Sequence, residues 1–120
     1  MRTESKKLLF DIARACRSIQ EFNAGGNLVE YSADAMRRAA TERMFEIIGE
    51  AVVRLRERDP ATCHRISEAH AIAAFRNRLI HGYDLVDEEV VWNIIQEKVS
   101  RLLAEVDGLL REPESPDTDE

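Results

Sequence analysis

Apolar residues recur every three or four positions along most of the chain, with charged residues between them, as is typical of amphipathic helices. Residues 4–23 form the first predicted helix, with the apolar positions Leu8, Ile12, Ala15, Ile19 and Phe22. The glycine-containing stretch NAGGN ends it. Residues 33–58 form the second, with the apolar stripe Met36, Ala40, Met44, Ile47, Ile48, Ala51 and Leu55. We expect Ser32 to cap this helix and Pro60 to break the chain after it.

Two further helices follow from the same periodicity. The third covers residues 67–82, is rich in alanine, and ends at Gly82, which suits the residue after a helix C-terminus. The fourth covers residues 87–110, with Asp87 as its cap. Gly49 lies inside the second helix, where glycine costs roughly 1 kcal/mol relative to alanine. A close approach of another helix at Gly49 would offset that cost.

Four amphipathic helices joined by short connections predict an all-α fold, an up-and-down four-helix bundle. Residues 1–110 form this one domain, and residues 111–120 form an acidic tail that we expect to be disordered. The apolar stripe of the fourth helix is longer than a single bundle can cover. The pattern therefore predicts a homodimer.

Composition agrees with a helical protein and limits its partners. The chain has 120 residues, 6% of them aromatic, with five glycines and three prolines, too few for a sandwich or barrel with frequent turns. The formal charge is −6, of which the tail carries five acids and one base. The remaining body is nearly neutral, unlike a general nucleic-acid coat protein. Any nucleic acid would be bound locally, by a few arginines on one face.

The sequence contains no pattern typical of a membrane span, a signal peptide or a metal site, and this indicates the compartment and the cofactors to expect. No apolar run approaches the roughly 20 residues that cross a bilayer, and the first ten residues contain no hydrophobic signal core. We therefore expect a cytoplasmic protein with no membrane partner. Cys16 and Cys63 are too few for a zinc site and are expected to be reduced. Histidines His64 and His70 lack a ligand pattern, so no metal and no cofactor is predicted.

Polar chemistry is concentrated between residues 76 and 83. This stretch holds Arg76, Asn77, Arg78, His81 and Tyr83. Burying such groups without partners would cost a few kcal/mol each, so the cluster indicates either a site or a well-paired interface. A histidine in the last turn of a helix can exchange protons in phosphodiester cleavage, and an arginine can hold the phosphate. The chemistry indicated is metal-free RNA cleavage, in which the ribose 2′-hydroxyl attacks its own phosphate.

Helical geometry constrains how these groups can meet. Asn77 and His81 are one turn apart on the same face. Arg76 and His81 are five positions apart, so their directions differ by about 140°. They can converge if the long arginine side chain curls, or if they meet their counterparts in a second protomer. The second route predicts a composite site on a two-fold axis.

The same residues carry a family resemblance. RNRLIH followed by GY resembles the signature of HEPN-domain proteins, in particular HepT-like toxins: arginine, four residues, histidine, one residue, tyrosine. The likeness extends to ERMFEIIGEA and to IHGYDLVDEEVVWNII, and it covers roughly residues 5–110. No motif position departs from the family pattern.

The resemblance implies a helical dimer with the motif at its interface and, for many members, metal-independent endoribonuclease activity. It matches Arg76 and His81 to the catalytic pair and Asn77 to the polar residue beside the arginine. It also implies a partner, a minimal nucleotidyltransferase antitoxin, which transfers AMP to the motif tyrosine, here Tyr83. AMPylation would add bulk and negative charge beside the phosphate-binding arginine and so repel RNA.

Simpler interpretations stay open. Arg76 and His81 can serve a dimer interface without catalysis, and Tyr83 can simply pack at the end of its helix. Arg78 is a surface residue that is either solvated or in contact with phosphate. The alternative function is a non-catalytic HEPN interaction subunit that docks a nucleotidyltransferase and binds nucleotide. The sequence does not decide whether the antitoxin modifies Tyr83 or masks the site.

Overall fold

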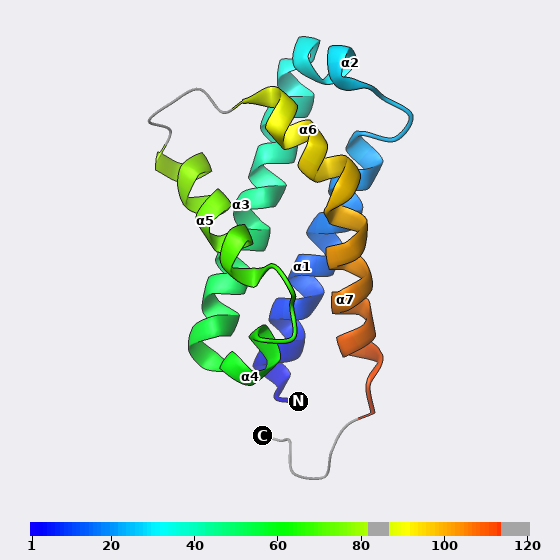
Figure 1. Cartoon of the computed structure of the whole chain (residues 1–120). Coiled ribbons are helices and arrows are strands. Elements are labelled where there is room, and N and C mark those ends of the chain that lie inside the picture. Colours follow the sequence, from blue (N-terminus) through cyan, green and yellow to red (C-terminus); the bar gives the residue numbers. More distant parts are fainter. Residues whose placement is uncertain (82–86, 114–120) are drawn as a thin grey trace.

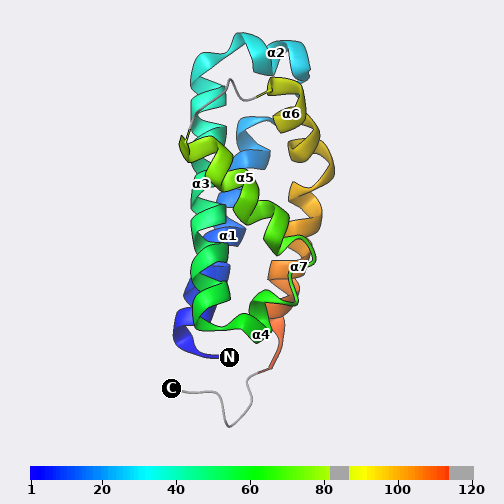
Figure 2. The ribbon, with the colours of Figure 1, turned by 60° about the vertical axis from the view of Figure 1, so that its left-hand side comes forward.

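Three long segments run side by side along the length of the molecule in the computed structural model, which describes residues 1–81 and 87–113 (Figure 1). They are α1 (Thr3–Phe22), α3 (Ala35–Arg58) and the pair α6 (Glu88–Glu97) and α7 (Val99–Arg111). The fourth, α5 (Ala69–His81), lies against α3 on one side of the bundle. Two short helices, α2 (Leu28–Ala33) and α4 (Pro60–Cys63), lie at opposite ends (Figure 2). The predicted all-α bundle is confirmed, and the described residues contain no strand.

The core lies between α1, α3 and the α6–α7 pair. The predicted apolar stripe of α1 is confirmed at Leu8, Ile12, Ala15 and Ile19, which are buried, but not at Phe22, which is exposed. Leu9, which the predicted stripe lacked, is also completely buried. Val52 and Leu55 face them from α3, and both are also completely buried. Burying each such side chain stabilises the fold by roughly 1.5–3 kcal/mol.

The end of α1 follows the prediction. Asn23 is its C-terminal cap, and the Asn23 side chain donates to the Ile19 carbonyl at 2.8 Å and to Thr41 Oγ1 at 3.2 Å. Gly25 has a φ of 72°, a conformation that glycine adopts without strain. The NAGGN turn therefore ends α1, and its first residue, Asn23, is bonded to α3 through Thr41.

The predicted start of the second helix was wrong. Residues 28–33 form the separate helix α2, capped by Asn27, and α3 is capped by Asp34 rather than by Ser32. Met36 is 84% exposed, whereas Tyr31 is fully buried and packs against Trp92 with ring centroids 5.7 Å apart. The apolar stripe of α3 is also broader than predicted, because α3 is covered by α1 on one side and α5 on another. It includes the buried residues Phe45 and Val52, which the predicted stripe lacked, and the polar residue Thr41 is buried on α3 as well.

Two connections differ from the prediction. Pro60 ends α3 as expected, but residues 60–63 then form the helical turn α4, with Pro60 in its first turn and Asp59 as its cap. The predicted fourth helix is interrupted at Lys98, whose φ of −113° and ψ of −32° separate α6 from α7. The cap at Asp87 is confirmed, since its side chain accepts from the Glu89 amide at 2.9 Å.

Ion pairs connect neighbouring segments at the surface. Arg17 on α1 contacts Asp107 on α7 at 2.7 Å, and Arg38 on α3 contacts Glu88 on α6 at 3.3 Å. Glu112 bonds to Arg65, while residues 114–120 of the predicted tail lie outside the described part of the chain. Cys16 and Cys63 are buried and are not joined by a disulfide. Among the described residues, no helix is long and apolar enough to cross a membrane.

Candidate functional site

The predicted site residues lie on the last two turns of α5, except Tyr83, which lies outside the described residues. α5 packs on α3, and among its side chains Ala73 is the one that is buried. Asn77, Arg78 and His81 are exposed, and Arg76 is half-buried. α5 thus presents most of its polar groups on its outer surface and turns Arg76 toward the bundle.

Arg76 is fixed by two neighbours. Its Nη1 donates to Asn77 Oδ1 at 3.3 Å. Its stem lies directly against Gly49 of α3, where an added Cβ would come within 2.1 Å of Arg76 Cβ. The predicted close helix approach at Gly49 is therefore confirmed. The sequence did not indicate that the approaching residue would be Arg76.

The Arg76 guanidinium retains an unused donor. Its Nε atom is buried and has no hydrogen-bond acceptor among the described residues. An unpaired buried donor costs roughly 1–3 kcal/mol, more when the group is charged. An acceptor brought by a ligand or by a second protomer would remove that cost.

Arg76 and His81 are both on α5, so the helical geometry inferred from the sequence applies to them. Their side chains leave the helix axis about 140° apart. Asn77 and His81 share a face, and Asn77 also bonds to Arg76. Asn77 therefore links the half-buried Arg76 to the exposed face that carries His81.

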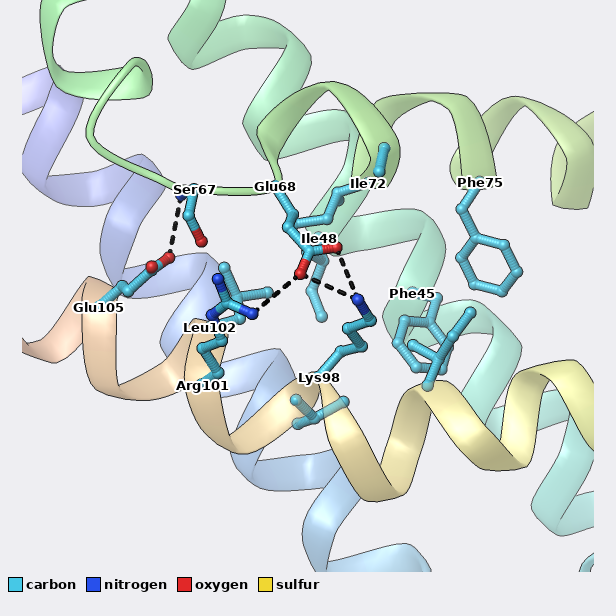
Figure 3. A pocket seen from close by; sticks show the side chains of 13 residues that line it. Phe45, Ile48, Ser67, Glu68, Ile72, Phe75, Lys98, Arg101, Leu102 and Glu105 are labelled. Carbon is cyan, nitrogen blue, oxygen red and sulfur yellow. Dashed lines mark hydrogen bonds and ion pairs between the residues drawn. The ribbon is translucent and has the colours of Figure 1, made fainter.

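A crevice of about 290 Å³ opens between α5 and the α6–α7 pair (Figure 3). Its floor is apolar, with Ile48, Ile72 and Phe75 among its lining. The charged groups at its mouth are paired, since Glu68 accepts from Lys98 at 3.0 Å and from Arg101 at 3.2 Å. Arg76 and His81 do not line it. We therefore place the candidate site on the polar residues of α5 rather than in this crevice.

A second polar group lies near the start of α3. Burial raises the pKa of the Tyr31 phenol, and the nearby Glu42 carboxylate raises it further. The Tyr31 hydroxyl is buried and has no partner among the described residues. Burial also raises the pKa of Glu42, although the Arg38 guanidinium opposes this. The aromatic contact with Trp92 gives Tyr31 a packing role.

Metal ligands do not cluster in the part of the chain that the structure describes. No group of three or more histidine, cysteine, aspartate or glutamate side chains is arranged to hold an ion there.

Comparisons with known proteins match most of the chain. The family model described as ribonuclease HepT-like matches residues 12–109, which include all of α5. The chain is 31% identical over 109 residues to a protein of Thermococcus cleftensis named "Probable ribonuclease HepT", covering 91% of this chain and 98% of that protein. It is 29% identical over 112 residues to a protein of Methanocaldococcus jannaschii named "Putative RNase", covering 93% of this chain and 92% of that protein.

No solved structure matches the chain at a significant level. The family match and the relatives nevertheless cover nearly the whole of the described fold. The chain belongs to the HepT-like ribonuclease family.

Proposed function

We propose that this protein is a metal-independent endoribonuclease, the toxin of a toxin–antitoxin pair, and that it acts as a homodimer. The observation that carries the proposal is the arrangement of Arg76, Asn77 and His81 on α5 in a chain of a ribonuclease family. An arginine with an unused buried donor is suited to a phosphate ligand, and an exposed histidine one turn from Asn77 is suited to proton transfer.

In the proposed reaction the ribose 2′-hydroxyl attacks the adjacent phosphorus and the 5′-oxygen leaves. His81 accepts the proton of the 2′-hydroxyl and returns a proton to the departing 5′-oxygen, and Arg76 stabilises the additional negative charge on the phosphoryl oxygens. Asn77 holds the Arg76 guanidinium through their hydrogen bond. The products are an RNA with a 2′,3′-cyclic phosphate and an RNA with a 5′-hydroxyl.

The dimer would complete the site. Because Arg76 and His81 diverge on one helix, a second copy packed on the outer face of α5 would bring the two sets of groups to a shared axis. That face also carries the exposed small residue Ala74, which allows a close approach of the partner helix.

Cleavage assays test the nuclease. We expect the purified protein to cut RNA in the presence of EDTA and to leave cyclic phosphate ends. His81→Ala should lower the rate on the order of 100-fold to 10,000-fold through the loss of proton transfer, and Arg76→Ala on the order of 100-fold to 1,000-fold through the loss of charge stabilisation.

His70→Ala is the matched control, because His70 is an exposed histidine at the start of the same helix. It should leave the rate within about twofold. Equal inactivity of the wild type and His81→Ala on varied RNAs, with the protein isolated free of modification, would reject the enzyme and favour a non-catalytic subunit that docks a nucleotidyltransferase.

We further propose that a minimal nucleotidyltransferase antitoxin silences this nuclease by transferring AMP to Tyr83. Tyr83 is two residues after His81 in the sequence, so an added phosphate would stand near the site that must receive RNA.

Mass spectrometry after co-expression with the candidate antitoxin tests this step. We expect the Tyr83 peptide to gain the mass of one or more AMP units and the nuclease activity to be lost. Tyr83→Phe should stay unmodified and active. If the antitoxin inhibits Tyr83→Phe as strongly as the wild type, it masks the site and does not act through the tyrosine.

A further inference from the structure

Gly49 and Arg76 meet at the closest point between α3 and α5. A Cβ built on Gly49 would lie 2.1 Å from Arg76 Cβ, 2.5 Å from Arg76 Cγ and 3.5 Å from Arg76 Cα. Non-bonded carbon atoms prefer about 3.5–4.0 Å. The stem of Arg76 therefore occupies the space that any larger residue at position 49 would need.

This contact determines where the guanidinium lies. A free arginine side chain samples many rotamers, and fixing it costs roughly 2 kcal/mol of entropy. Here the first carbons of Arg76 are held by the α3 backbone at Gly49, and the Nη1 end bonds to Asn77 Oδ1. The side chain is thus in contact with a neighbour at both ends, and its buried Nε donor has no acceptor among the described residues.

We propose that Gly49 is a positioning residue, which sets the depth of Arg76 between the helices and so places its guanidinium for the phosphate. This inference rests on the proposed ribonuclease function. Gly49 touches neither the phosphate nor the reacting atoms, and it acts through Arg76 alone. A misplacement of about 1 Å can lower a rate on the order of 100-fold, so even a small shift of α5 would be measurable.

Gly108 provides a matched control. Like Gly49 it lies inside a helix, here α7, but an added Cβ there would meet nothing within 4 Å. Replacing glycine by alanine at either position stabilises the helix by the same amount, roughly 1 kcal/mol, through helix propensity. The two variants therefore differ in the contact with Arg76.

The first measurement is spectroscopic and does not require activity. The Nε–Hε signal of Arg76 in a proton–nitrogen NMR spectrum can be assigned by its loss in Arg76→Lys. We expect the chemical shift of this signal to change in Gly49→Ala and to remain unchanged in Gly108→Ala. An unchanged Arg76 signal in Gly49→Ala would overturn the proposal.

The second measurement is kinetic. We expect Gly49→Ala to lower kcat on the order of 10-fold to 100-fold, with helix content by circular dichroism retained, and Gly108→Ala to stay within about twofold. Equal loss in both variants would overturn the proposal. If the wild type cleaves no RNA while the Arg76 signal still depends on residue 49, the ribonuclease function fails and the placement of Arg76 by Gly49 stands.

Should Gly49→Ala not fold, the wild type itself gives the answer. Nitrogen-15 NMR relaxation, measured at the arginine Nε atoms, reports how rigid each guanidinium is. We expect Arg76 to be rigid and the exposed Arg78, two residues further along α5, to be mobile. Equal mobility of the two arginines would show that Gly49 does not hold Arg76.

Discussion

Asp59 joins three parts of the chain through one carboxylate. It accepts from Ser5 Oγ on α1 at 2.6 Å, from Thr62 Oγ1 at 2.7 Å and from the Thr62 amide at 3.2 Å, where it caps α4. Burial raises the pKa of Asp59, but these hydrogen bonds outweigh burial and leave the pKa below its ordinary value of 3.8. The folded protein thus favours the ionised carboxylate.

Removing this carboxylate should destabilise the corner between α1, α3 and α4. We expect Asp59→Ala to lower the free energy of unfolding by about 2 kcal/mol, because a helix cap is lost and the buried Ser5 hydroxyl loses its acceptor. Urea unfolding at neutral pH measures the loss. Glu57→Ala, which removes an exposed acid two residues earlier, should change stability by less than about 0.5 kcal/mol.

The same carboxylate gives a pH dependence of known sign. A carboxyl group whose pKa is lower in the folded protein than in the unfolded chain stabilises the fold fully at any pH above its unfolded pKa. This stabilisation is lost as the pH falls through the pKa that the group has in the folded protein. The stability difference between wild type and Asp59→Ala should therefore be constant above about pH 5 and shrink as the pH falls through the unfolded pKa near 3.8 and then through the lower folded pKa. A difference that stays constant over this range would mean that the ionised form is not favoured in the folded state.

At the scale of elements, α5 differs from the other long helices. α1, α3 and α7 each bury several apolar side chains, whereas α5 buries Ala73 among its described residues. Its partly buried residues Ile72 and Phe75 pack against the edge of the core and line the crevice, and the Phe75 ring meets the Phe45 ring of α3 edge to face with centroids 5.3 Å apart. The contacts that hold α5 in place include Phe75 with Phe45, Arg76 with Gly49, and Glu68 with Lys98 at the beginning of the helix.

The interruption at Lys98 is related to this arrangement. Lys98 lies at the junction of α6 and α7, and its ammonium group reaches both carboxylate oxygens of Glu68 at 3.0 Å. The change of direction at Lys98 lets α6 pack on α2 while α7 packs on α1. A single straight helix over residues 87–110 would not pack on both α2 and α1.

At the scale of the whole molecule, the outer face of α5 is the surface on which the proposed homodimer depends. Ala74 is exposed on that face, near the polar residues Asn77 and His81. Within one protomer an exposed alanine contributes little to stability. A dimer would bury it, and a large charged residue there would keep the two helices apart.

Ala74→Arg should therefore dissociate the dimer without unfolding the protomer. Sedimentation equilibrium should give twice the chain mass of 13.7 kDa for the wild type and the single mass for the variant. RNA cleavage should fall with dissociation, because the site draws on both copies. Ala104→Arg, at an exposed alanine of α7, is the control and should remain dimeric. A wild type that sediments as a monomer while cleaving RNA would contradict the composite site.

The sequence alone was sufficient to predict the helical class, the ends of α1, the cap at Asp87 and the residues of the motif, because periodicity, capping and turn chemistry act over a few neighbouring positions. It also indicated that a helix would approach Gly49, because a glycine inside a helix carries a local cost.

The tertiary structure decided that α2 is a separate helix, that the chain bends at Lys98, and that Arg76 is the residue packed on Gly49. Each of these depends on which segments meet in space. Tyr31 is buried because Trp92 packs against it from 61 positions further along the chain. A local pattern contains no information about such distant partners, and the folded packing supplies it.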